Sequence, residues 1–257
     1  MAEEKKIDTW KKFSKHIRSR NTDLLKGLSY YPEAILVGGC QRSGTTMISN
    51  AIMQGEGIEK LSELDSALVL AEVVGPNLNG NYCFQTTYIN ERFYEYWKYG
   101  KKNKLVWMVR NPYSVVYSLT RFSERFCLDE LFLGCGKHVM NKSDQVKFDR
   151  FGSFAINRIR RACYSYNAKV NQLVSILQNL DEERVIVVDY DELVKDKCVI
   201  LASIYKFFGI HYKPEFSELI NEKSIGKASN LSKDTRFLID SLSGPYYDLA
   251  KKLVCKI

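Results

Sequence analysis

Short runs of apolar residues, each ending in glycine or polar residues, recur along the chain. Residues 34–39 (AILVGG), 105–109 (LVWMV) and 184–190 (RVIVVDY) have the length and continuity of buried strands. We expect a helix after each strand, the first over residues 45–53. Strands that alternate with helices predict an α/β fold with a central parallel sheet flanked by helices.

Two further segments have helical periodicity. Residues 1–30 are polar with apolar residues at helical spacing, and residues 154–180 repeat this spacing over many turns. Neither an internal repeat nor a low-complexity linker interrupts the chain. The length of 257 residues therefore predicts one domain over residues 1–257.

The composition excludes several classes of protein. Hydrophobic residues make up 45% and charged residues 26%, as in globular proteins. Apolar runs are too short to span a bilayer, and the N-terminus shows no secretory signal, so we expect a cytoplasmic protein. The seven cysteines form no CxxC pair, and with three histidines they predict no metal site.

The net charge of +8 predicts anionic partners. The basic residues are dispersed, which favours local anion sites over a basic tail, and no nucleic-acid-binding motif is present.

A glycine-rich loop follows the first predicted strand. Residues 38–46 (GGCQRSGTT) have the spacing of the phosphate loop GxxxxGK[ST], in which backbone N–H groups and a helix N-terminus bind phosphate. Thr45 stands at the lysine position, and the cation is Arg42. The missing lysine argues against nucleotide hydrolysis, because that lysine contacts the β- and γ-phosphates.

A second anion motif follows the next predicted strand. Residues 110–118 (RNPYSVVYS) place Arg110 at the end of the strand and Ser118 about two helical turns later. An arginine fork with a hydroxyl group suits a terminal phosphate. Because ligands bind at the carboxyl ends of parallel strands, both motifs are expected on one edge of the sheet.

These motifs resemble those of the PAPS-dependent sulfotransferases, where PAPS is 3′-phosphoadenosine 5′-phosphosulfate. Residues 41–46 (QRSGTT) are similar to the family's loop P-[KR]-S-G-T-T, apart from Gln41 at the proline position, and 110–118 match its R-x-P signature with a serine eight residues after the arginine. The resemblance covers residues 34–210, with residues 1–30 as a helical segment and 211–257 as a C-terminal loop and helix. It implies a P-loop NTPase-like sulfotransferase fold and transfer of a sulfuryl group from PAPS to a hydroxyl or amine, with release of PAP and without a metal.

The resemblance also implies roles for individual residues. Arg42 would contact the region between phosphate and sulfate, and Arg110 with Ser118 would hold the 3′-phosphate. The 5′-phosphate would be held by Ser43, Gly44, Thr45 and Thr46. Tyr190, in the segment VDYDELVKD, would reach the adenine, and Lys223 or Lys227 would close over the 3′-phosphate. Alternatively, Tyr190 only packs between the sheet and a helix, and the segment with Lys223 and Lys227 is a solvated loop.

The general base is expected after the first phosphate-binding helix. No histidine lies between His16 and His138, and the segment KLSELDSALVLAE offers Glu63, Asp65 and Glu72. By its resemblance to the glutamate-base tyrosylprotein and heparan branch, without the membrane anchor of those enzymes, the chain is expected to use Glu63. Alternatively, Glu63 only caps a helix.

The sequence leaves the acceptor open: a small molecule, a peptide and a glycan all remain. An aromatic cluster over residues 93–99 lines either an acceptor pocket or the core. A P-loop kinase or NTPase and an inactive PAP(S)-binding protein are alternative functions. The oligomeric state is not indicated.

Overall fold

The structure is a computed structural model that describes residues 7–20, 22–59, 61–77, 79–89, 92–122 and 125–254. Within these residues, five parallel strands form a central sheet in the order β2-β3-β1-β4-β5. In chain order the strands are β1 (Ile35–Gly39), β2 (Ile58–Glu59), β3 (Asn81–Gln85), β4 (Lys104–Val109) and β5 (Val185–Asp189). The predicted α/β fold with a parallel, helix-flanked sheet is confirmed.

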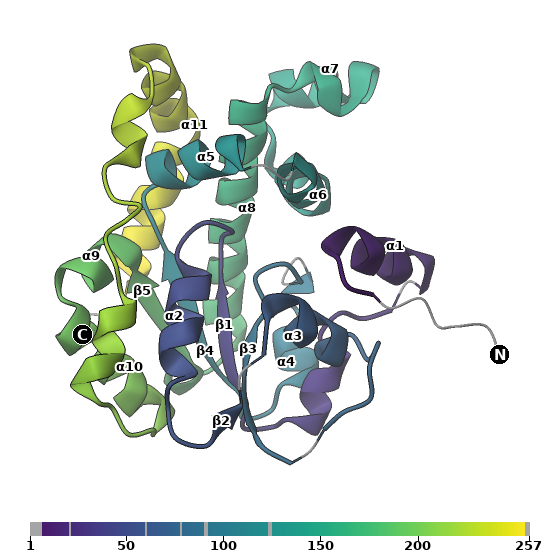
Figure 1. The fold of residues 1–257 in the computed structure, drawn as a ribbon. Helices are drawn as coiled ribbons and strands as arrows, with labels where there is room; N and C mark the ends of the chain where they lie inside the picture. Colours follow the sequence, from purple (N-terminus) through teal and green to yellow (C-terminus); the bar gives the residue numbers. More distant parts are fainter. Residues whose placement is uncertain are drawn as a thin grey trace.

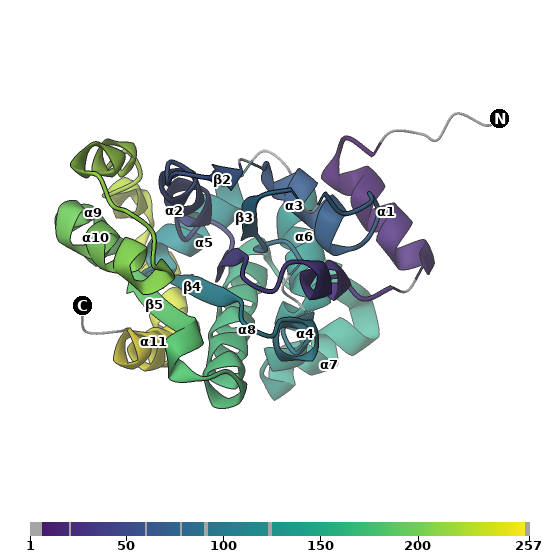
Figure 2. The ribbon, with the colours of Figure 1, turned by 90° about the horizontal axis from the view of Figure 1, so that it is seen from below.

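Helices lie on both sides of this sheet, and Figures 1 and 2 show them from two directions. They are α1 (Trp10–Arg20), α2 (Thr45–Ile52), α3 (Glu63–Leu70), α4 (Glu95–Tyr99), α5 (Pro112–Arg121), α6 (Arg125–Gly134), α7 (Lys142–Phe151), α8 (Arg158–Asn179), α9 (Tyr190–Lys195), α10 (Lys197–Phe208) and α11 (Lys233–Leu253).

Three predicted strands exist, but the sequence did not predict β2 and β3. β2 has only two residues, and β3 reads NYCFQ, which lacks a continuous apolar run. β3 is nevertheless buried over most of its length, because it pairs with β1 on one side and with β2 on the other. Its position in the middle of a sheet, rather than its composition, makes it a strand.

Several predicted boundaries were wrong. The third predicted strand, 184–190, ends at Asp189, whose carboxylate accepts hydrogen bonds from the next turn and so starts α9 at Tyr190. The predicted helix 154–180 begins only at Arg158, where Asn157 provides the N-cap. In the predicted helical segment 1–30, α1 is followed by a separate 3-10 turn over Lys26–Tyr30.

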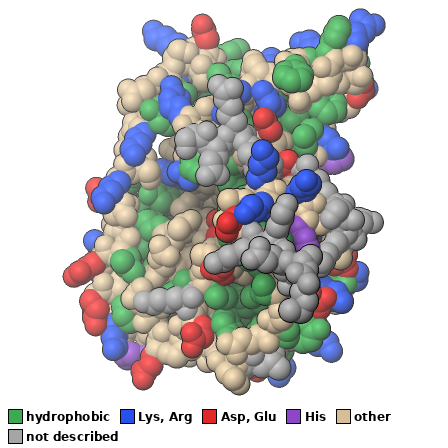
Figure 3. All heavy atoms as spheres, turned by 45° about the vertical axis from the view of Figure 1, so that its right-hand side comes forward, with side chains coloured by type: hydrophobic (Ala, Val, Ile, Leu, Met, Phe, Trp, Pro, Cys, Tyr) green, Lys and Arg blue, Asp and Glu red, His purple; other side chains and the backbone are tan. Residues whose placement is uncertain are grey.

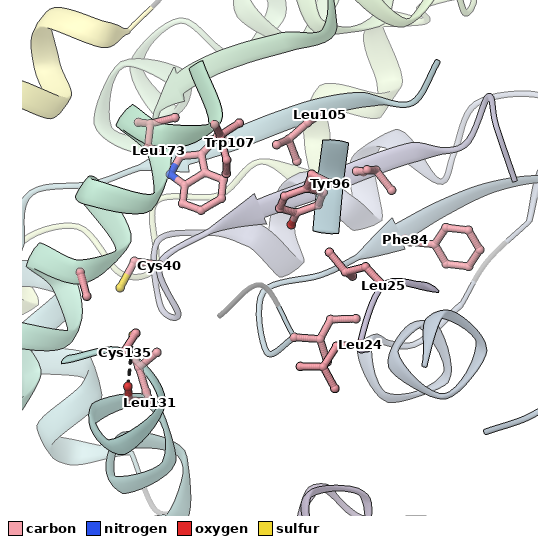
Figure 4. Close-up of a cluster of buried hydrophobic side chains, with 14 of the residues drawn as sticks. Leu24, Leu25, Cys40, Phe84, Tyr96, Leu105, Trp107, Leu131, Cys135 and Leu173 are labelled. Carbon is pink, nitrogen blue, oxygen red and sulfur yellow. Dashed lines mark hydrogen bonds between the residues drawn. The ribbon is translucent and has the colours of Figure 1, made fainter. Parts of the chain in front are cut away.

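Alternate residues of β4 pack into two separate cores. Trp107 points toward one core with α3, α5, α8 and α11, whereas Val106 and Met108 point toward the other with α2, α9 and α10. In the first core Trp107 lies beside Leu173 of α8 (Figure 4). A strand that is buried on both faces must be apolar throughout, which explains the continuous apolar run in the sequence.

The surface carries charges of both signs. On the face drawn in Figure 3, lysine and arginine side chains are interspersed with acidic and other side chains. Among the described helices, none is both long enough and apolar enough to cross a membrane.

Candidate functional site

The loop between β1 and α2 has a backbone that few residues can adopt. Gly39, Arg42 and Gly44 have φ angles of 139°, 72° and 94°. The N–H and hydroxyl groups of Ser43 both donate to the carbonyl of Cys40, at 3.2 and 2.6 Å, which closes the turn. The loop therefore wraps around the N-terminus of α2, where free N–H groups and the helix dipole favour an anion.

Arg42 and Ser118, which belong to different sequence motifs, contact each other. The Nε group of Arg42 donates to the hydroxyl of Ser118 at 2.8 Å, and its guanidinium lies 4.5 Å from the ring centroid of Phe122. Arg42 is exposed, so this contact holds its side chain at the entrance of the site. This hydrogen bond joins the Arg42 loop to α5.

Arg110, at the end of β4, is buried with only 4% of its surface exposed. It donates to the carbonyl of Arg42 at 3.2 Å and to the carbonyl and hydroxyl of Ser224 at 3.1 and 3.0 Å. Its Nε atom has no hydrogen-bond partner among the described residues. Burial lowers the pKa of Arg110, against the opposite influence of Tyr190 and Asp191. A buried cation with an unused donor is a favourable position for an anion.

Tyr190, the first residue of α9, packs between the loop and Arg110. The guanidinium of Arg110 lies 4.0 Å from the centroid of the Tyr190 ring, and the Tyr190 hydroxyl pairs with that of Ser224 at 2.6 Å. On the other side, a Cβ atom at Gly44 would lie 2.4 Å from the ring. The ring is only 3% exposed, so packing fixes its position.

These residues surround a cavity of about 400 Å³ at the carboxyl ends of β1, β4 and β5. The predicted binding residues that line it are Arg42, Gly44, Thr45, Thr46, Arg110, Ser118, Tyr190 and Lys227. Ser43 is fully buried and supports the turn, and Lys223 is exposed and does not line the cavity. Of the two lysines that the sequence offered, the geometry therefore favours Lys227.

The cavity contains residues that the sequence analysis missed. Ser224, which bonds both Arg110 and Tyr190, lies between the two predicted lysines, Lys223 and Lys227, but no motif singled it out. Arg121 lies three residues after Ser118 on α5, and its guanidinium covers the Tyr117 ring at 3.9 Å from the centroid. Helical spacing from Ser118 was the available signal for Arg121, because residues three apart share a helix face.

Glu63 is the first residue of α3 and lies near the end of β3. Burial raises the pKa of its carboxyl group to about 8, although hydrogen bonding by Gln85, Thr87 and the backbone of Tyr88, and the charge of Arg42, lower it. Its Oε1 atom is buried without a hydrogen-bond partner among the described residues. A buried carboxyl group whose pKa is raised in this way has the properties of a proton acceptor.

The two other carboxylates of this segment have structural partners. Asp65 is exposed, and its N–H and carboxylate both pair with the side chain of Ser62, which caps α3. Glu72 forms an ion pair with Lys26 at 2.7 Å. Helix capping, the structural alternative for Glu63, is therefore carried out by Ser62 and Asp65.

Gln85, at the end of β3, connects Glu63 to the loop. Its side-chain amide donates to the hydroxyl of Thr46 at 3.1 Å and lies 3.3 Å from the hydroxyl of Thr45. The same side chain lowers the pKa of Glu63. Sequence reasoning missed this residue because it did not predict β3. No group of three or more potential metal ligands occurs within the described part of the chain.

Known proteins resemble this chain in family and in fold. A family model described as a sulfotransferase domain matches residues 32–233. Crystal structures with similar folds include a sulfotransferase from Alicyclobacillus acidocaldarius (14% identity, 86% of this chain and 94% of that chain, TM-score 0.53) and a mouse sulfotransferase complexed with PAP (14% identity, 90% and 91%, TM-score 0.53).

A third similar structure is a sulfotransferase from Mycobacterium avium, with 13% identity over 91% of this chain and 80% of that chain and a TM-score of 0.53. No curated protein matches the sequence. At these identities the structural similarity shows a common fold, whereas the family model shows common descent over most of the chain.

Proposed function

The chain belongs to the sulfotransferase domain family, and we propose that it transfers a sulfuryl group from PAPS to a hydroxyl or amine of an acceptor and releases PAP. One observation carries the proposal. A single cavity brings together the loop before α2, the buried cation Arg110 and the exposed cation Arg42. The two motifs, 68 residues apart, thus form one anion-binding site.

The residues around the cavity suit a nucleotide with phosphate at both ends. The loop offers the N-terminus of α2 and the hydroxyls of Thr45 and Thr46 to a 5′-phosphate. Arg110, with its free Nε, and Lys227 offer positive charge to a 3′-phosphate. Tyr190 is nearly covered, so it would present only its edge to an adenine.

PAPS, when bound, supplies a sulfuryl group attached to its 5′-phosphate. Arg42 would stabilise the negative charge that develops on the leaving phosphate, because it is held at the cavity by Ser118. Glu63 in its carboxylate form would accept the proton of the attacking hydroxyl. The carboxylate then becomes a neutral acid, a state that its buried position already favours.

Calorimetric titration with PAP, and with ADP in parallel, tests the proposed donor. We expect micromolar binding of PAP and at least tenfold weaker binding of ADP, about 1.4 kcal/mol for the 3′-phosphate. Arg110→Lys should remove most of this difference, because a lysine cannot reproduce the fork. Arg150→Lys, an exposed position on α7, is the matched control.

Two results would contradict the proposal. Equal binding of PAP and ADP would mean that Arg110 does not bind a 3′-phosphate, and would favour a kinase-like nucleotide enzyme. Binding of PAP without transfer from ³⁵S-labelled PAPS, in a screen of phenols, alkyl alcohols, amines, tyrosine peptides and glycans, would indicate a binding protein.

A further inference from the structure

A second cavity, of about 360 Å³, lies between α1 and α6. Its walls are mainly apolar and aromatic, and they include Trp10, Phe13, Ile17, Tyr88, Ile89 and Leu131. The polar side chains at this cavity include Ser14, which donates to Glu130 at 3.0 Å. A volume of this size and an apolar lining with a few polar groups are typical of sites for small molecules.

This cavity adjoins the nucleotide site across the phosphate loop. Gln41 lines the α1–α6 cavity, whereas its neighbour Arg42 lines the nucleotide cavity. The Gln41 amide donates to the carbonyl of Thr87 at 3.0 Å, which ties the loop to the segment after β3. The next residue, Tyr88, lines the cavity. Its backbone forms a hydrogen bond with Glu63 that lowers the pKa of that carboxyl group. Glu63 itself lines neither cavity, but it contacts the backbone of Tyr88, which lines the α1–α6 cavity, and it is close enough to Arg42 of the nucleotide cavity for that charge to lower its pKa.

One wall of the cavity lies outside the part of the chain that the family model matches. That match covers residues 32–233, whereas α1 ends at Arg20. The rings of Trp10 and Tyr88 stack with centroids 4.2 Å apart and planes inclined by 17°. Trp10 also packs edge-on against Phe13, with centroids 5.6 Å apart. Aromatic stacking thus attaches α1 to Tyr88, whose backbone contacts the proposed base Glu63.

We propose that α1 completes an acceptor site, and that the acceptor is an alcohol with a compact apolar body, preferably aromatic; this rests on the proposed sulfuryl transfer. The apolar walls stabilise such a body by excluding water from it. A glycan would leave many hydroxyls without partners against these walls, at a large cost in free energy. The hydroxyl of the acceptor would point across Tyr88 toward Glu63 and Arg42.

Titration of the PAP-saturated protein with 2-naphthol, an alcohol with an aromatic body, tests this inference. We expect wild-type protein to bind 2-naphthol at least tenfold more tightly than methyl α-D-glucoside. Trp10→Ala should weaken binding of 2-naphthol at least tenfold and leave binding of PAP unchanged. Phe237→Ala, at a position on α11 that is 77% exposed, is the control aromatic truncation and should change neither affinity.

A second variant fills the site instead of removing a wall. Ser14→Phe places a ring into the cavity from the partly exposed face of α1 and should block 2-naphthol while PAP still binds. Circular dichroism establishes that each variant is folded. If one variant fails to fold, the other still tests whether 2-naphthol occupies this cavity, and wild-type protein that binds 2-naphthol no better than the glucoside overturns the inference without any variant.

The outcomes separate this inference from the proposed donor. If PAP binds but 2-naphthol binds no better than the glucoside, or if Trp10→Ala does not weaken it, the acceptor site is wrong and the PAPS proposal stands. If 2-naphthol binding depends on Trp10 but PAP does not bind, the cavity is a ligand site and the proposed donor is wrong. Transfer of ³⁵S from PAPS to 2-naphthol, lost in Trp10→Ala, would support both.

Discussion

The ring of Tyr190 lies so close to Gly44 that no other side chain fits between them. A Cβ atom at Gly44 would lie 2.4 Å from Cδ2 of the ring, and the φ angle of this glycine is 94°. The contact joins the phosphate loop to α9, although the two residues are far apart in the sequence. The loop and the ring therefore form a single packed unit beneath the cavity.

Gly44→Ala should accordingly disrupt the site. The methyl group must displace the Tyr190 ring, so we expect at least tenfold weaker binding of PAP and a loss of about 2–4 kcal/mol in the free energy of unfolding. Urea unfolding and calorimetry measure the two effects. Gly57→Ala is the control, because Gly57 has a φ of 74° but open space around its Cα atom. Equal losses in both variants would mean that backbone strain alone, not the ring contact, matters.

Arg42 and Ser118 should contribute to function as a pair. Ser118→Ala removes the partner that positions Arg42, so we expect a lower kcat for sulfuryl transfer in addition to weaker PAP binding. A double-mutant cycle with Arg42→Lys should show a coupling energy of about 0.5–2 kcal/mol in kcat/KM. Ser203→Ala, at a helix surface on α10, is the control. Additive effects would contradict the assigned pairing.

The raised pKa of Glu63 makes the activity depend on pH. The base acts as a carboxylate, so kcat/KM for the acceptor should rise with pH and level off above about pH 8. Glu63→Gln should abolish turnover at every pH and leave PAP binding intact. An unchanged turnover in Glu63→Gln, or a profile without an inflection near this pH, would remove Glu63 from the mechanism.

The same pKa shift predicts a change in stability. Burial raises the pKa of Glu63 above its unfolded value of about 4.5, so the folded state binds the proton more tightly than the unfolded state does. The resulting contribution to the free energy of unfolding is fully present below the unfolded pKa. It is lost as pH rises toward about 8, where the buried carboxylate destabilises the fold. Glu63→Gln should therefore be more stable than wild type at pH 9, by about 1–4 kcal/mol. Asp65→Asn, an exposed position in the same turn, is the comparison in urea unfolding.

Gln85 should set the pH at which the enzyme becomes active. Its amide lowers the pKa of Glu63, so Gln85→Leu should move the inflection of the kcat/KM profile to higher pH. Binding of PAP should also weaken slightly, because Thr46 loses its partner. The shift of the profile distinguishes this positioning role from a purely structural one. A variant with lower activity but an unchanged inflection would show that Gln85 does not act on Glu63.

Much of the nucleotide site was predictable from local patterns. The strands β1, β4 and β5 are continuous apolar runs because both of their faces are buried, and the loop before α2 carries Gly39 and Gly44 at positions with positive φ. Parallel strands then place Arg42 and Arg110 at the same edge. These relationships follow from short segments and from one general rule of sheet geometry.

The region around the proposed base and acceptor was much less predictable. β3 carries Gln85 at its end. Because both ends of this short strand are polar, the sequence does not predict it, and only its pairing with β1 makes it a strand. The aromatic cluster over residues 93–99 contributes Tyr96 to the core, with Phe93, Trp97 and Tyr99 packed against it, as the core alternative required. The cavity is instead lined by Trp10 and Tyr88, which no local pattern connects.

The parallel sheet and the residues of the phosphate loop could be predicted from the sequence, because those features depend on neighbouring residues and on strand order. Three features depend on long-range packing instead: the burial of Glu63, the position of Lys227 at the nucleotide cavity, and the position of α1 in the wall of the second cavity. Burial and long-range packing bring together segments such as α1 and the end of β3, which share no local signal. The chemistry of Glu63 arises from this packing, since the same residue exposed at the start of a helix would be an ordinary acid.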